Sequence, residues 1–253
     1  MKMKAKHLCM TVIVIICMIS TSAYAEWHFG IGTGPARLSI DGDMGLNLPV
    51  AGGPVKFKVK ADPDDISDVM DSAIGLGGYA ANGKWLFQAS YGKLKLEGKE
   101  NIGVYSLKLG FDITSAEFMT SYTVLQNDVF KLNLIGGLRY TEHELSSDFS
   151  SGGTHYKRNL DNDWTDAVVG TSVVFPFTQT LSWKTSFDYG FGGSEGIFTA
   201  NTGLTWRFFR GFSATLFYKY ATVDFENGSR GDADWYLYDV DEKSLGLTIL
   251  YNW

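Results

Sequence analysis

The chain ends with Lys243-Ser244-Leu245-Gly246-Leu247-Thr248-Ile249-Leu250-Tyr251-Asn252-Trp253. In an extended strand this stretch places Leu245, Leu247, Ile249, Tyr251 and Trp253 on one face, and Ser244, Gly246, Thr248 and Asn252 on the other. A strand with one wholly apolar face that ends on an aromatic residue is unusual for a soluble terminus, whose last residues are usually polar and mobile. It is typical of the closing strand of a barrel whose outer face contacts lipid.

The first 25 residues have the pattern of a secretory signal peptide. Lys2, Lys4 and Lys6 precede an apolar run over residues 8–19, and Ala23-Tyr24-Ala25 is a small-x-small cleavage site. The run is shorter than the roughly 20 residues that a helix needs to span a bilayer, which favours a cleaved signal over an anchor. We therefore expect residues 1–25 to be removed and residues 26–253 to form a single domain.

Composition excludes several classes of function. Loss of the three signal lysines takes the net charge from −6 to −9, and such an acidic chain lacks the basic stripe that a nucleic-acid partner requires. Cys9 and Cys17 both lie in the signal, so neither a disulfide nor a thiolate metal site is expected afterwards. No cofactor is predicted. Because no apolar run approaches 20 residues beyond the signal, the chain is expected to cross a membrane only with β-strands.

Alternation with period two runs through almost all of the remaining chain and predicts a closed antiparallel all-β barrel. The predicted strands number ten: 27–38, 72–81, 85–96, 104–125, 129–144, 164–175, 181–191, 197–208, 213–226 and 236–253. Eight strands is the alternative count, since the segment 104–125 is long. Its alternation changes phase near Thr114, which predicts a bulge there.

Two classes of connection alternate along the predicted strands. The segments 39–71 and 145–163 are long and polar, and 97–103, 192–196 and 227–235 are shorter loops, whereas turns such as Asn82-Gly83 are tight. Short turns on one side and long loops on the other are typical of a transmembrane barrel, with the turns in the periplasm and the loops outside the cell. A soluble barrel is the rival interpretation. Small, mostly uncharged residues alternate with the apolar ones on strands 181–191 and 197–208, which favours a narrow lumen over a solvent-facing sheet.

In these features the chain resembles the small porin-like outer-membrane β-barrel proteins of Gram-negative bacteria. The resemblance is most specific at the end, where Ser244, Gly246, Ile249, Tyr251 and Trp253 match the polar-x-Gly-x-x-hydrophobic-x-hydrophobic signal that the barrel-assembly machinery recognises. A final Phe is commoner in that class than Trp253. The resemblance implies export to the periplasm and insertion into an outer membrane containing lipopolysaccharide. It implies no single activity, and it leaves the oligomeric state open.

Strand phase predicts which charged side chains point into the lumen. They are Glu117, Lys131, Arg139, Asp166, Lys184, Asp188, Arg207 and Lys219. Buried charges must be paired or hydrated, so they predict either an ion-pair network that fills a structural barrel or a narrow polar path for small solutes. The basic excess of this set would favour anions.

Two further functions are alternatives. An enzyme acting on lipid or peptide at the outer rim would use His143, which lies in Thr141-Glu142-His143-Glu144 near Ser146 and Ser147, although no family motif surrounds it. An adhesin would use the loop triplet Arg230-Gly231-Asp232, which resembles the integrin-binding tripeptide.

The first long connection carries an acidic segment. Asp62 as N-cap and Pro63 at the first helical position predict a short helix, with Ile66, Val69 and Met70 on one side, that would form a lid over the mouth or pack as an ordinary loop. Its acids match no calcium-loop spacing. In the last loop, Trp235, Tyr236 and Tyr238 are expected to mark the outer membrane interface.

Overall fold

The computed structural model describes residues 26–48, 53–102, 105–151 and 154–253. The predicted signal peptide, residues 1–25, therefore lies outside the described residues. The described chain is almost entirely strand, with one short helix, α2 (Pro63–Val69). The strands are β1 (Trp27–Thr33), β2 (Ala36–Leu48), β3 (Gly53–Ala61), β4 (Met70–Asn82), β5 (Trp85–Ile102), β6 (Tyr105–Gln126), β7 (Lys131–Ser151), β8 (Thr154–Pro176), β9 (Leu181–Phe191), β10 (Gly196–Phe209), β11 (Phe212–Asn227) and β12 (Tyr236–Asn252).

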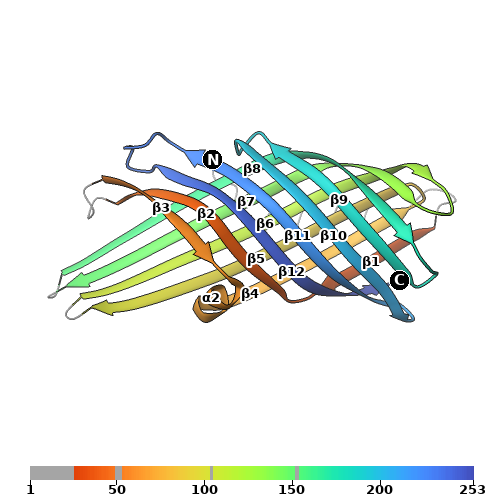
Figure 1. Ribbon diagram of the computed structural model, residues 1–253, viewed down its shortest axis with the longest axis horizontal. Helices are drawn as coiled ribbons and strands as arrows, with labels where there is room; N and C mark the ends of the chain where they lie inside the picture. Colours follow the sequence, from red (N-terminus) through yellow and green to blue (C-terminus); the bar gives the residue numbers. More distant parts are fainter. Residues whose placement is uncertain (1–25, 49–52, 103–104, 152–153) are drawn as a thin grey trace.

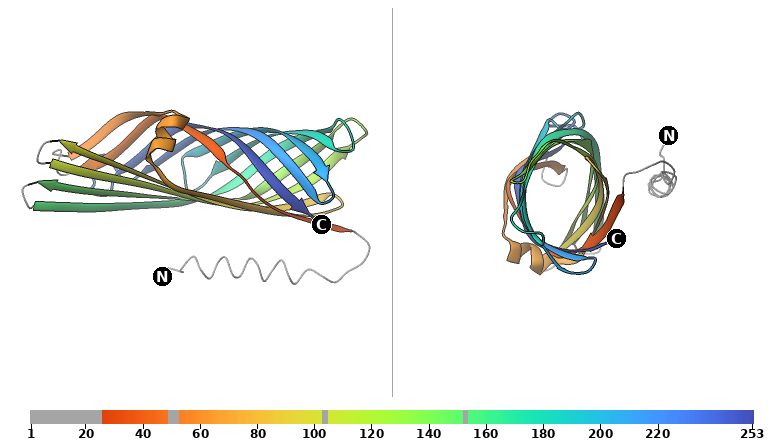
Figure 2. Two further views of the ribbon diagram at one scale, coloured as in Figure 1. Left: turned by 90° about the horizontal axis from the view of Figure 1, so that it is seen from below. Right: turned by 90° about the vertical axis from the view of Figure 1, so that its right-hand side faces the viewer.

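These strands form one antiparallel sheet that closes on itself. Neighbouring strands follow the order β1-β4-β5-β6-β7-β8-β9-β10-β11-β12, and β1 pairs with β12 to complete a ten-stranded barrel (Figure 1). The view along the barrel in Figure 2 shows the closed wall. The predictions of an all-β closed barrel and of ten strands are confirmed. The hairpin formed by β2 and β3 is additional, and β2 pairs with the first half of β12.

One end of the barrel carries only short turns, and β1 begins and β12 ends there. Phe29 and Trp253 exchange backbone hydrogen bonds across the β1–β12 seam, each 3.0 Å long. The four connections β4–β5, β6–β7, β8–β9 and β10–β11 are the predicted tight turns, and Gly83 adopts a positive φ of 56° in the first of them. We call this the turn end and the opposite end the mouth.

The strands at the mouth are longer than the sequence analysis predicted. Residues 97–102, expected to be a loop, extend β5. The segments 39–71 and 145–163, also expected to be loops, form most of β2, all of β3 and α2, and the ends of β7 and β8. Their polar residues alternate with apolar ones such as Leu145 and Leu160, which pack on the hydrophobic core of the barrel. The prediction treated polarity as a loop signal, whereas here it marks the water-facing side of a strand.

The apolar face of the strands changes sides partway along the barrel. On β6, Phe118 is exposed on the outer face, whereas Phe111 and Ile113 pack inside. On β12, Leu245 is exposed outside while Tyr238 is fully buried. Pairing runs through Thr114 without a shift on either side, so the predicted bulge is wrong. The phase change arises because one half of each strand turns its apolar side to lipid and the other half turns it to a core.

The level of this change is consistent from strand to strand. Thr114 pairs with Lys93 of β5 and Glu142 of β7, and Glu142 pairs with Asp163 of β8. We call these four residues the boundary ring. On the turn side of the ring the outer face is an apolar belt of exposed large side chains, including Ile74, Leu138, Val169, Phe187, Leu204, Trp206, Leu216, Leu247 and Ile249. Because so large a contiguous apolar surface is unstable in water, the belt marks the part that lies in the membrane.

An aromatic girdle edges the belt at the turn end. Trp27 stacks on Phe29 and Phe87, and Phe29 stacks on Trp253 with ring centroids 5.9 Å apart. Phe130, Phe175 and Trp183 form a second group. On the mouth side of the ring the outer face is instead charged, with pairs such as Lys93–Asp112 at 3.6 Å and Lys56–Asp43 at 3.0 Å. The barrel therefore extends beyond the membrane into water.

The wall of this extension is split between β3 and β5. Among the described pairings, β3 pairs only with β2, and β5 beyond Leu96 pairs only with β6. The helix α2 lies beside this split and contacts β2, β3 and β5, with Ile66 buried in the core (Figure 2, left). The predicted helix start is confirmed, since Pro63 opens α2 and the Asp62 backbone N–H donates to Asp65 Oδ2 at 2.9 Å. The helix forms part of the side wall and is not a lid over the mouth.

Candidate functional site

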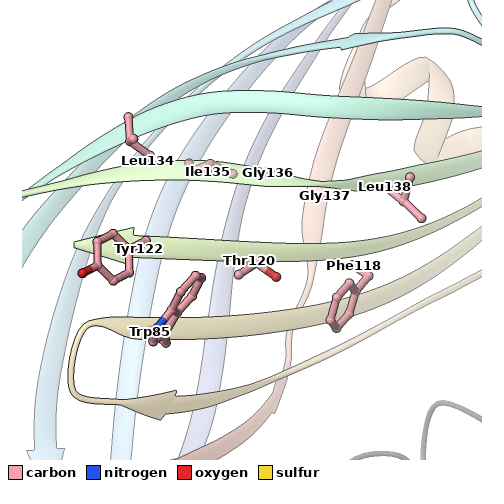
Figure 3. Close-up of a pocket in the computed structure, with 9 residues that line it drawn as sticks. All are labelled: Trp85, Phe118, Thr120, Tyr122, Leu134, Ile135, Gly136, Gly137 and Leu138. Atoms are coloured by element: carbon pink, nitrogen blue, oxygen red, sulfur yellow. The ribbon is translucent and has the colours of Figure 1, made fainter. Parts of the chain in front are cut away.

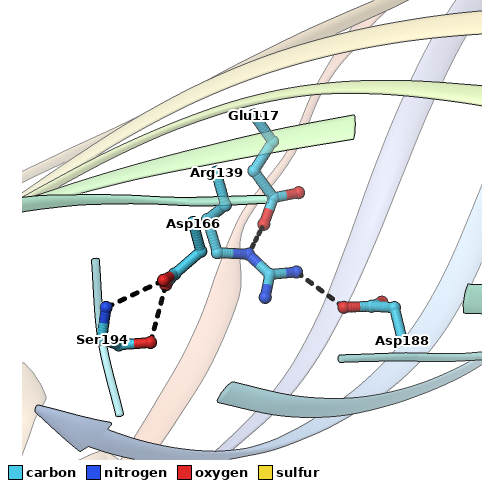
Figure 4. Close-up of polar contacts among 5 residues, drawn as sticks. All are labelled: Glu117, Arg139, Asp166, Asp188 and Ser194. Atoms are coloured by element: carbon cyan, nitrogen blue, oxygen red, sulfur yellow. Dashed lines mark hydrogen bonds and ion pairs between the residues drawn. The ribbon is translucent and has the colours of Figure 1, made fainter. Parts of the chain in front are cut away.

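Arg139 occupies the middle of the lumen and binds two carboxylates. Its Nε donates to Glu117 Oε1 at 2.7 Å and its Nη2 to Asp188 Oδ1 at 3.0 Å (Figure 4). The three residues come from β6, β7 and β9, so the interaction spans part of the lumen. The Arg139 side chain is almost fully buried, whereas both carboxylates retain some exposure. We call Glu117, Arg139 and Asp188 the Arg139 cluster.

Asp166 lies beside this cluster but has a different partner. Its Oδ1 accepts a hydrogen bond from the Ser194 backbone N–H, and its Oδ2 accepts one from Ser194 Oγ at 2.9 Å (Figure 4). The backbone N–H of Gly193 also donates to Oδ1. The side chain is 0% exposed. Asp166 thus anchors the short β9–β10 loop to the inside of the barrel, and its charge is satisfied by dipoles rather than by a cation.

Of the other predicted lumen charges, two are partly buried and two are exposed. Lys184 and Lys219 are partly buried, and Lys219 interacts electrostatically with Glu117. Lys131 and Arg207 are exposed near the turn end and join no cluster. Glu242 was not among the predicted lumen charges, and it accepts a hydrogen bond from the Tyr238 hydroxyl at 2.8 Å. It alternates in phase with Ser244 and Gly246, so strand phase was the signal that could have found it.

Aromatic side chains fill the lumen on the mouth side of the boundary ring. His143 is 1% exposed, and its ring meets those of Phe111, Trp164 and Tyr238 edge-on with centroids 5.1, 4.9 and 4.5 Å away. Its Nδ1 lies 2.9 Å from the Tyr236 hydroxyl, and Trp164 stacks on Phe225 at 4.0 Å. The members of this aromatic block are Phe111, His143, Trp164, Phe225, Tyr236 and Tyr238.

The prediction that Trp235, Tyr236 and Tyr238 mark the outer membrane interface is wrong. Tyr236 and Tyr238 are fully buried inside the barrel instead of marking a membrane interface. Trp235 is 2% exposed, and its indole N–H donates to Glu226 at 2.7 Å. Aromatic residues near a strand end resemble an interfacial girdle in sequence, but here the lipid ends well before the strand does.

The residues proposed for catalysis are not brought together. Strand alternation places His143 inside the barrel and its neighbours Glu142 and Glu144 outside, where Glu144 lies 3.9 Å from Lys93. Burial lowers the pKa of His143 to about 3, so the ring is neutral at physiological pH. His143 contacts aromatic rings and the Tyr236 hydroxyl, and these contacts are those of a core residue.

The Arg230-Gly231-Asp232 triplet lies in the exposed loop between β11 and β12. Asn47 Nδ2 donates to the backbone carbonyl of Asp232 at 2.8 Å, which ties this loop to β2. The Asp232 carboxylate accepts a hydrogen bond from the Ser229 backbone N–H at 2.7 Å. One oxygen of the Asp232 carboxylate is therefore held within its own turn.

A shallow groove runs along the outer face within the apolar belt. Gly136 and Gly137 of β7 and Thr120 of β6 lie between larger residues, including Trp85, Phe118, Tyr122, Leu134 and Leu138 (Figure 3). Lys84 Nζ lies 5.9 Å from the Tyr122 ring centroid near one end of the groove. A groove with apolar walls in this belt would be filled by membrane acyl chains.

The predicted assembly signal lies on the final strand with its residues on both faces. Ile249, Tyr251 and Trp253 are exposed outside, and Gly246 is buried inside. A Cβ at Gly246 would overlap the ring of Phe217, which is its partner on β11. Packing against Phe217 in the folded barrel therefore explains why position 246 is a glycine.

Among the described residues, no helix is long and apolar enough to cross a bilayer. The same residues contain no group of three or more His, Cys, Asp or Glu side chains arranged to hold a metal ion.

Comparison with solved structures finds bacterial proteins of low sequence identity. The outer-membrane protease OmpT from Escherichia coli is 9% identical with a TM-score of 0.48, covering 92% of this chain and 99% of its own. The translocator domain of the autotransporter NalP from Neisseria meningitidis is 11% identical (TM-score 0.40; 98% and 96% covered). Ail, the attachment invasion locus protein of Yersinia pestis, is 13% identical (TM-score 0.37; 90% and 99% covered).

No family model matches the chain, and no curated protein matches it. At the TM-scores found, the solved structures assign neither a family nor an activity. The closed barrel and its apolar belt nevertheless make the chain a transmembrane β-barrel of the type that Gram-negative outer membranes contain.

Proposed function

We propose that the chain is an outer-membrane barrel with a closed lumen, acting as a structural element and not as a channel for small solutes. The observation that carries this proposal is the filling of the lumen at two levels. The Arg139 cluster occupies it at membrane depth, and the aromatic block occupies it in the extension. A hydrated ion passing through would have to displace both.

The two levels resist opening for different reasons. Moving Arg139 aside would break its bonds to Glu117 and Asp188, at a cost of up to about 3–5 kcal/mol for a broken buried ion pair. Opening the aromatic block would expose several buried rings to water, at about 1.5–3 kcal/mol for each large apolar side chain. Thermal motion that breached both levels together would be rare.

The proposed location sets the partners of the barrel. We propose that the signal peptide directs export and that the barrel-assembly machinery recognises the final strand. In the outer leaflet the barrel would contact lipopolysaccharide. The charged outer face beyond the boundary ring would lie among the lipopolysaccharide head groups.

Planar-bilayer recording of the refolded full-length mature chain tests the closed lumen. We expect no discrete conductance steps from protein whose heat-modifiable gel migration shows that it is folded. A variant with Trp164→Ala, Tyr238→Ala and Arg139→Ala, which empties both levels, should show steps if it folds. Discrete steps from the unmodified barrel would overturn the proposal and favour the narrow channel.

A further inference from the structure

The split in the extension wall leads into a cavity, and the proposed closed lumen gives this cavity no function. The cavity has a volume of about 350 Å³ and lies between β2, β3, α2 and the mouth halves of β5 to β8. Its apolar lining includes Met44, Phe57, Val69, Leu96, Phe111 and Leu160. Pockets that bind small molecules are of this size and are mostly apolar with a few polar groups.

The rim of the cavity is apolar although it lies outside the membrane belt. Leu96 and Leu109 are beyond the boundary ring, and Phe57, Val69 and Leu109 are exposed by 39%, 38% and 50%. The neighbouring outer surface carries ion pairs such as Lys108–Glu97 at 2.8 Å. An exposed apolar cluster on a charged, water-facing surface is typical of a binding site.

One charged side chain lines the cavity, and it is a cation. Arg158 of β8 donates from Nη1 to the Asn47 carbonyl and from Nη2 to the Ala233 carbonyl, which holds the guanidinium in place at the mouth. Arginine has five N–H donors, so these two bonds leave donors for another acceptor. A guanidinium above an apolar cavity fits an anionic head group joined to a hydrocarbon chain.

The unpaired edges of β3 and β5 provide the way in. Because the described residues of β3 and β5 are not bonded to each other, a chain-like molecule can pass between them without breaking the ladder of the closed barrel. Entry from the side also avoids the aromatic block, so this site does not depend on whether the lumen conducts. We propose that the cavity binds a single-chain amphiphile with a carboxylate head, such as a free long-chain fatty acid, with its chain against Leu96 and Phe111 and its carboxylate at Arg158.

Gly98 offers a variant that fills the cavity without disturbing the wall. It lines the cavity, and no atom lies within 4 Å of where its Cβ would be, so Gly98→Phe places a ring in empty space. Glu97→Phe adds the same ring to the opposite face of the same strand and is the matched control. It removes only the exposed pair with Lys108, which contributes little to stability.

The test uses full-length mature protein in lipid nanodiscs, because detergents are themselves single-chain amphiphiles. A palmitic acid carrying a photoactivatable diazirine is added and the labelled peptides are identified by mass spectrometry. We expect labelling near Leu96, Leu109 and Leu145, competition by unmodified palmitic acid, at least a fivefold loss in Gly98→Phe and no loss in Glu97→Phe. Labelling confined to belt residues, or equal in Gly98→Phe, would overturn the site.

The head group is tested separately. Arg158→Gln should weaken binding of palmitic acid about tenfold, the effect of losing one charge-assisted hydrogen bond, and should leave binding of the uncharged hexadecanol unchanged. Lys157→Gln removes the adjacent cation, which faces outward and pairs with Asp148 at 3.1 Å, and should change neither affinity. Equal palmitate binding by Arg158→Gln and the unmodified chain, both folded by gel migration, would overturn the carboxylate assignment.

Discussion

Phe29 and Trp253 close the barrel, because they join the first and last strands by two backbone hydrogen bonds of 3.0 Å and by stacked rings 5.9 Å apart. The backbone bonds need no particular side chain, whereas the stacked pair does. The pair also continues the aromatic girdle across the seam through Trp27 and Tyr251.

Trp253→Ala should therefore slow closure and weaken the seam. Loss of an aromatic pair costs about 0.5–1.5 kcal/mol beyond the lost burial. We expect a lower yield of the heat-modifiable folded form in a refolding time course into lipid vesicles. Trp206→Ala removes a similarly exposed belt tryptophan away from the seam and should have the smaller effect. Equal yields of the two variants would show that the seam has no special need for its aromatic pair.

Arg139→Leu should destabilise the barrel strongly. It removes the guanidinium that bonds both Glu117 and Asp188, and breaking a buried pair costs up to about 3–5 kcal/mol. Lys219 stays near Glu117 and Lys184 near Asp188. Urea unfolding in vesicles, followed by tryptophan fluorescence, measures the loss. Arg207→Leu is the control, because Arg207 is exposed at the turn end, and its unfolding midpoint should barely move. If the unfolding midpoint of Arg139→Leu equals that of Arg207→Leu, the Arg139 cluster is hydrated and contributes little to stability.

His143 should make stability depend on pH below about 6.5. Burial holds its folded-state pKa at about 3, below the unfolded value of about 6.5, so between these pH values only the unfolded state binds the proton. Above pH 6.5 the residue has no effect, and each unit of pH below it lowers the free energy of unfolding by about 1.4 kcal/mol.

This effect is measured by comparing the unmodified chain with His143→Gln, which keeps a hydrogen-bond acceptor for Tyr236. Between pH 7 and pH 5 the unmodified chain should lose about 2 kcal/mol more than the variant. His28→Gln removes an exposed histidine near the turn end and controls for loss of an imidazole in general. Parallel pH profiles for all three proteins would contradict a buried neutral His143.

Gly246→Ala tests why the assembly signal contains glycine. Its added Cβ would overlap the Phe217 ring, so we expect a lower folding yield in vesicles that contain no assembly machinery. Adding Phe217→Leu should restore the yield, because the smaller side chain removes the overlap. Failure of the second substitution to rescue folding would show that glycine is needed at this position for a reason other than packing against Phe217.

Strand phase and turn chemistry made most of the barrel predictable, since alternation such as Leu181 to Phe191 admits few other folds. Strand phase failed to predict the structure at the level where the strands leave the membrane. Near Thr114 it inferred a bulge, because period two alone cannot show that the apolar face has passed from lipid to core. It placed Arg139, Glu117 and Asp188 in the lumen, but pairing of side chains from three strands depends on their relative stagger, which one sequence does not contain. The cavity depends on the split between β3 and β5. It could not be predicted, because residues 39–71 were expected to be a loop and β3 lies within them.

The boundary ring also has a consequence for biogenesis. Residues such as Lys93, Asp112 and Glu144 end in water on the far side of the membrane, so if insertion proceeds from the periplasm, each of these charges crosses the hydrocarbon layer once. A lone ion in that layer costs several kcal/mol, and an ion pair formed beforehand costs less. Lys93 lies 3.6 Å from Asp112 and 3.9 Å from Glu144, and Lys95 lies 3.6 Å from Asp112, so two cations balance two carboxylates. These side chains come from β5, β6 and β7, so the group is neutralised only after the three strands have paired. We therefore expect sheet formation in this region to precede translocation.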